Sequence, residues 1–93
     1  MSYIDIPVVE EIDEKKIIRK FKEVLNREDS KVNKVSILIG KGNYFEHIAV
    51  CSTNLKYMDN LIEKEKSTNP ELVVRVFEGT INGKKVKCIV EKA

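Results

Sequence analysis

The pattern of hydrophobic and polar residues is most regular between residues 14 and 27. Apolar side chains recur there at the spacing of a single helix face; they are Ile17, Ile18, Phe21, Val24 and Leu25. Asp13 precedes this stretch, where its carboxylate can accept hydrogen bonds from the first backbone amides of a helix. Ile12 can pack against Ile17 in the first turn. The pattern therefore predicts an amphipathic helix over residues 14–27.

A second apolar stripe has the same spacing and is formed by Leu55, Met58, Leu61 and Ile62. Thr53 or Asn54 can cap its N-terminus. Asn69 and Pro70 end it, because the residue before a proline disfavours the helical conformation. A second helix is therefore expected between residues 55 and 68.

Runs of β-branched and aromatic residues predict strands over residues 3–9, 35–39, 72–81 and 84–91. Pro7 limits the first of these to a sheet edge or a bulge. Asn82-Gly83 is a preferred hairpin turn, and it pairs Glu78 with Lys87, Phe77 with Cys88 and Val76 with Ile89. Residues 44–51 have two interpretations, a strand that forms a hairpin around Gly40–Asn43 or the start of a helix. We favour the hairpin.

The order of these elements predicts the fold class. A shift of 37 residues superimposes the first helix and its following strand on the second helix and its following strand. The order is β-α-β-β-α-β plus one extra C-terminal strand. We expect a single α+β domain over residues 1–93, a ferredoxin-like two-layer sandwich with a mostly antiparallel sheet and two helices on one face.

Both faces of the last predicted hairpin are apolar. One face holds Val73, Phe77, Cys88 and Val90, and the other holds Val74, Val76 and Ile89. Two helices on one face would leave the other uncovered, whereas a sheet face in water should be polar. We therefore expect a homodimer through the sheet, with Val73, Phe77, Cys88 and Val90 as the first candidate interface.

Composition narrows the class of protein. The chain has 93 residues, of which 42% are hydrophobic and 34% charged, as in an ordinary globular domain. No apolar run approaches the ~18 residues of a membrane span, and residues 1–13 have no secretion signal, so we expect a cytoplasmic protein without a membrane partner. Cys51 and Cys88 are expected to be reduced core thiols. Abundant Lys, Ile and Asn also suit an AT-rich genome such as that of a virus or mobile element, and abundant Lys and Glu suit a thermophile.

The net charge of +2 is unevenly distributed. Residues 1–13 carry −4, residues 14–41 carry +5, residues 42–83 carry −2 and residues 84–93 carry +3. Opposite the apolar stripe of the first helix lie six basic residues, Arg27 among them, and one acid, Glu23. Five of these bases are the candidate binding residues: Lys15, Lys16, Arg19, Lys20 and Lys22. Such a face attracts phosphates, and Lys84 and Lys85 at the predicted hairpin turn extend the positive charge.

Signs of catalysis, metal or cofactor binding are weak. His47 is the single histidine, so general-base, triad and histidine-based metal sites would all depend on it. The Gly40-Lys41-Gly42 sequence lacks the third glycine, and the Ser or Thr after the lysine, that phosphate-binding loops require. We expect no enzyme activity, no cofactor and no metal. Binding of a small nucleotide or another small ligand at the Gly40–Asn43 turn is the third-ranked hypothesis.

Short segments resemble the RNA-recognition motif family: Tyr3-Ile4-Asp5-Ile6-Pro7, Asp13-Glu14, Ile18-Arg19-Lys20-Phe21, Ile81-Asn82-Gly83-Lys84 and the last five residues. The resemblance implies a ferredoxin-like sheet that binds RNA. The middle of the chain departs from the family pattern, because Asn43, Tyr44 and Glu46 stand where that pattern has other residues.

The functional prediction is a small macromolecule-binding domain. The first hypothesis is nucleic-acid binding through Lys15, Lys16, Arg19, Lys20 and Lys22, aided by Lys84 and Lys85. The alternative is a protein-interaction or inhibitor module that uses an apolar sheet face.

Overall fold

The computed structural model describes residues 8–9, 12–27, 33–41 and 44–93. It contains two helices, α1 (Glu14–Arg27) and α2 (Leu55–Thr68), and a short 3-10 helix at Pro70–Leu72. The strands are β1 (Val8–Val9), β2 (Lys34–Lys41), β3 (Tyr44–Ser52), β4 (Val73–Ile81) and β5 (Lys84–Lys92). The predicted order of elements is confirmed. Residues 3–7 of the first predicted strand lie outside the described residues.

The sheet has the strand order β1-β2-β3-β5-β4. The four long strands are antiparallel to their neighbours, and the two-residue β1 adds to the edge of β2 in parallel. Residues 44–51 belong to a strand, so the hairpin interpretation of this segment is confirmed. The fold is therefore α+β, with two helices and four antiparallel strands.

The hairpin of β4 and β5 has the predicted register. Glu78 pairs with Lys87, Phe77 with Cys88 and Val76 with Ile89. Asn82 and Gly83 both have positive φ, 51° and 81°, as a tight turn between twisted strands requires.

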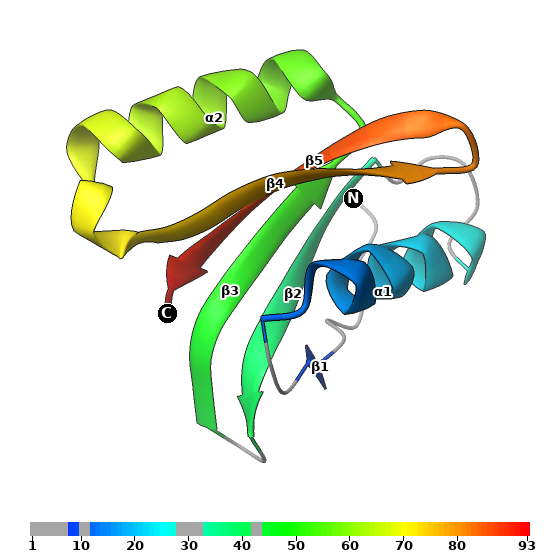
Figure 1. Ribbon diagram of the computed structural model, residues 1–93, viewed down its shortest axis with the longest axis horizontal. Helices are drawn as coiled ribbons and strands as arrows, with labels where there is room; N and C mark the ends of the chain where they lie inside the picture. Colours follow the sequence, from blue (N-terminus) through cyan, green and yellow to red (C-terminus); the bar gives the residue numbers. More distant parts are fainter. Residues whose placement is uncertain (1–7, 10–11, 28–32, 42–43) are drawn as a thin grey trace.

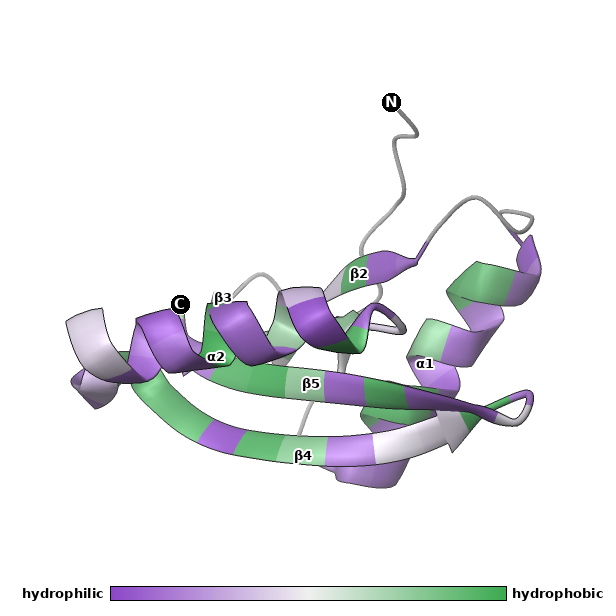
Figure 2. Ribbon diagram, turned by 90° about the horizontal axis from the view of Figure 1, so that it is seen from above, coloured by the Kyte–Doolittle hydropathy of each residue, from purple (hydrophilic) through white to green (hydrophobic). Residues whose placement is uncertain are grey.

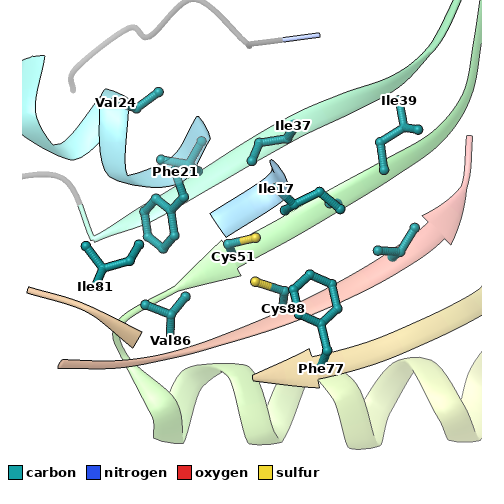
Figure 3. Close-up of a cluster of buried hydrophobic side chains, with 13 residues drawn as sticks. Ile17, Phe21, Val24, Ile37, Ile39, Cys51, Phe77, Ile81, Val86 and Cys88 are labelled. Carbon is teal, nitrogen blue, oxygen red and sulfur yellow. The ribbon is translucent and has the colours of Figure 1, made fainter. Parts of the chain in front are cut away.

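The helix α1 packs its predicted stripe on one face of the sheet. Ile17, Phe21 and Val24 are fully buried there. They contact side chains from every long strand, among them Ile37, Cys51, Phe77 and Val86, as Figure 3 shows. Asp13 caps the helix as expected, because its carboxylate accepts a hydrogen bond of 3.2 Å from the Lys16 amide.

The helix α2 covers the other face. Met58 and Ile62 are buried against Ile89, and Val50, Val73 and Val76 pack around them. Asn54 is the N-cap and accepts a hydrogen bond from the Tyr57 amide. In Figure 1, α2 lies above the β4–β5 hairpin and α1 lies below it. Figure 2, seen from the side of α2, shows the hairpin passing in front of α1.

The directions of the strands explain this placement. One crossover runs from β1 through α1 to β2 and the other from β3 through α2 to β4, and both advance toward the β4 edge. Because β3 is antiparallel to β2, the two crossovers start from strands of opposite direction. Right-handed crossovers of that kind place their helices on opposite faces. The ferredoxin-like strand order is not found, and the prediction of two helices on one face is wrong.

Candidate nucleic-acid interface

The five predicted basic residues of the first helix share the outer surface of α1, which we call the basic face: Lys15, Lys16, Arg19, Lys20 and Lys22. Lys15, Arg19 and Lys22 are exposed, and Lys16 and Lys20 are half-buried at the margin. At a rise of 1.5 Å per residue, the basic face extends about 10 Å along the helix axis.

The acidic residues of α1 neutralise little of this charge. The helix has six basic residues and two acidic ones. Glu14 is turned toward β4, where its carboxylate lies 3.6 Å from the guanidinium of Arg75. Glu23 lies 3.5 Å from the ammonium of Lys20 in an exposed pair. Among the described residues, no ion pair joins Lys15, Arg19 or Lys22 to an acid.

The packing beneath α1 fixes which way the basic face points. Phe21 and its buried neighbours hold the opposite side of the helix against the sheet. Gly79 of β4 lets the helix come close, because a Cβ at that position would lie 2.7 Å from the Cδ1 of Ile18. The basic face is therefore carried on a helix that cannot rotate without breaking the core.

Lys84 and Lys85 lie on opposite sides of the sheet. Lys84 pairs with Ile81, whose side chain belongs to the core beneath α1, so Lys84 is on the α1 side of the sheet. Lys85 is on the other side, since successive residues of a strand alternate. The hairpin tip lies at the same end of the molecule as the C-terminal end of α1 in both ribbon views (Figures 1 and 2). Only Lys84 can therefore extend the basic face.

The first candidate dimer interface is not an open surface. Phe77 is 7% exposed, Cys88 and Val90 are fully buried beneath α1, and Val73 packs on the opposite face against α2. Most of the apolar surplus of the strands is thus covered by two helices, one on each face, whereas Val74 of β4 stays 39% exposed. The homodimer stays a prediction without a surface assigned to it, and the protein-interaction alternative loses its open apolar sheet face.

Cys51 and Cys88 are both free thiols and lie directly opposite each other on β3 and β5. Their sulfur atoms point toward one another in the core, as Figure 3 shows. A hydrogen bond with Cys88, together with burial, raises the pKa of the Cys51 thiol well above its usual range. The neutral form of the Cys51 thiol is therefore favoured in the folded state.

The remaining predicted chemistry has little support. His47 is half-buried on β3 between Ile39 of β2 and Lys92 of β5. Within the described parts of the chain, no group of three or more His, Cys, Asp or Glu side chains could hold a metal ion. The glycine-rich turn lies partly outside the described residues, at positions 42 and 43.

A groove that the sequence did not reveal lies between α2 and the β4–β5 hairpin. It has a volume of about 380 Å³, and its lining residues are Asp59, Ile62, Glu63, Lys66, Ser67, Val76 and Lys87. Lys87 forms ion pairs with Asp59 and, at 3.5 Å, with Glu78. The hydrogen bond to Asp59 raises the pKa of Lys87. The predicted register of the β4–β5 hairpin already placed Glu78 opposite Lys87. The contact of Lys87 with Asp59 depends on the position of α2, which the sequence did not predict.

No protein-family model matches the chain, and no curated protein or solved structure has significant similarity to it. The resemblance to RNA-recognition motifs therefore gains no support from these comparisons. The sheet also differs in order, and α2 covers part of the face that lies opposite α1. In the described part of the chain, no helix has the length and apolar character to cross a membrane.

Proposed function

We propose that this protein binds nucleic acid through the basic face of α1, by contacts with phosphate groups and without covalent chemistry. The observation that supports the proposal is the gathering of five basic side chains on one surface of α1, where Glu23 is the one acidic residue of the helix that forms an ion pair with any of them among the described residues. Basic side chains that neutralise phosphates release condensed counterions, and this release favours binding at low salt.

The experiment is a titration of fluorescently labelled, mixed-sequence oligonucleotides, followed by anisotropy over a series of salt concentrations. We expect log K to fall linearly with log[salt], with a slope of about −0.9 for each phosphate contact on duplex DNA. The triple variant Arg19→Glu, Lys20→Glu, Lys22→Glu should bind at least tenfold more weakly and show a slope smaller by about three.

The helix α2 supplies a matched control. Lys56, Lys64 and Lys66 are exposed, and replacing all three by Glu changes the net charge by the same amount. This control should retain most of the affinity, because its charges lie on the opposite side of the sheet. Equal losses in the two triple variants would show a response to net charge alone and would contradict the proposal, as would an absence of binding by the wild type at low salt.

A further inference from the structure

The basic residues of α1 occupy two flanks of the helix rather than one line. At 100° per residue, Lys15 and Lys22 lie on one flank, and Lys16 and Lys20 lie on the other. Lys20 and Lys22 are about 160° apart around the helix axis. Arg19 lies between the flanks, on the crest of the exposed surface.

Two flanks of positive charge match a groove with phosphates on both walls. The major groove of B-form DNA is about 12 Å wide and admits one α-helix, whose diameter with side chains is about 10–12 Å. A helix in that groove has a phosphodiester strand on each side and base edges at its crest. Lys15 and Lys22 would then face one strand, and Lys16 and Lys20 the other.

The described surface of α1 has no exposed aromatic ring of the kind that binds single strands. Proteins that bind single-stranded nucleic acid combine a basic groove with exposed aromatic rings on which bases stack. The one aromatic residue of α1, Phe21, is fully buried. Tyr57 is exposed but belongs to α2, and its hydroxyl accepts a hydrogen bond of 2.8 Å from Lys34.

We infer that the nucleic acid bound by this protein is double-stranded DNA, with α1 lying in the major groove. This inference rests on the proposed function and specifies its ligand class. Duplex RNA fits less well, because its major groove is too deep and narrow for side chains to read.

The experiment compares four probes of one sequence and about 20 base pairs or nucleotides: duplex DNA, single-stranded DNA, duplex RNA, and duplex DNA with glucosylated 5-hydroxymethylcytosines. The sugars project from pyrimidine C5 into the major groove and leave the phosphates unchanged. We expect duplex DNA to bind at least tenfold more tightly than each of the other three. Equal or tighter binding of any of the other three would overturn the inference. If none of the four binds at low salt, the proposed function itself fails.

Single variants on the two flanks provide a second test. Lys20→Glu and Lys22→Glu should each weaken binding to duplex DNA several-fold, because each flank contacts its own strand. Lys64→Glu on α2 is the matched control and should leave affinity unchanged. A loss at one flank only would indicate contact with a single strand and would contradict groove insertion. Circular dichroism of each variant establishes that the fold is intact.

Discussion

At the scale of single residues, Glu91 and Glu65 form an unfavourable pair between β5 and α2. Partial burial of Glu91 raises its pKa, and its hydrogen bond with Glu65 and repulsion by that carboxylate raise it further. The pKa of Glu91 in the folded state lies above its value of about 4.3 in the unfolded state. At pH values just above about 4.3 the folded state therefore binds more protons than the unfolded state. The contribution of Glu91 to stability is therefore complete below about pH 4.3 and is lost as the pH rises through the folded-state pKa.

Replacing Glu65 by Gln should relieve this repulsion at neutral pH. We expect Glu65→Gln to raise Tm by about 1–3 °C at pH 7, a modest gain because both side chains are partly exposed. At pH 3.5 the Glu91 carboxyl is protonated, so the repulsion between the two side chains and the gain should vanish. Glu63→Gln is the control on the same helix. Equal gains at both pH values, or the same gain in the control, would contradict the assignment.

At the scale of elements, the close contact between α1 and β4 depends on the absence of a side chain at Gly79. A Cβ there would lie 2.7 Å from Cδ1 and 2.8 Å from Cγ1 of Ile18. Gly79→Ala should therefore lower the free energy of unfolding by about 1–3 kcal/mol, as overpacking of a core does. Urea denaturation followed by circular dichroism measures the change.

A double-mutant cycle isolates this contact. Ile18→Ala removes both crowding atoms, so the cost of Gly79→Ala should largely disappear in that background. If the two substitutions were simply additive, the contact between Ile18 and Gly79 would not be the cause of the loss.

The elements also show what sequence reasoning could and could not predict. The helix α1 and the hairpin of β4 and β5 depend on local signals, namely the spacing around Phe21 and the Asn82-Gly83 turn, and both were predicted correctly. The face of the sheet that α2 covers depends on which side of β2 the strand β3 pairs with. This pairing is a long-range contact, and no local sequence pattern predicts it. Apolar residues on both faces, such as Phe77 and Val76, were interpreted as a surplus, whereas each face has its own helix.

The candidate site also has features that the sequence could predict and features that it could not. The basic face of α1 was predictable because the phase of a helix fixes which residues share its surface. The separation of Lys84 from Lys85 follows from strand alternation, once the register places Lys84 opposite Ile81. The ion pair of Lys87 with Asp59 was missed because it joins elements whose packing the sequence does not specify.

At the scale of the whole molecule, the two thiols should report cooperative unfolding. Cys51 and Cys88 are fully buried on the two strands at the middle of the long antiparallel sheet, beneath α1. The thiolate is the reactive form, and the raised pKa of Cys51 disfavours it in the folded state. We expect both thiols to resist an aromatic disulfide reagent in the native protein and to become reactive together.

The measurement is thiol labelling across a urea titration, compared with the unfolding transition seen by circular dichroism. The two transitions should coincide, as expected of a two-state domain. Fast labelling of either thiol without denaturant would show that α1 opens locally from the sheet.

The strand order also has a consequence for the speed of folding. The four long strands of the sheet form two hairpins, β2 with β3 and β4 with β5, which meet along the single boundary between β3 and β5. Each hairpin joins neighbouring segments, and such structures form within about 1–10 μs. Pairing β3 with β5 brings together Ser52 and Lys87, which the intervening chain separates widely, so loop-closure entropy opposes this step. Both helices bury side chains from both hairpins, so neither core is complete until that boundary has formed, and its formation should limit the folding rate.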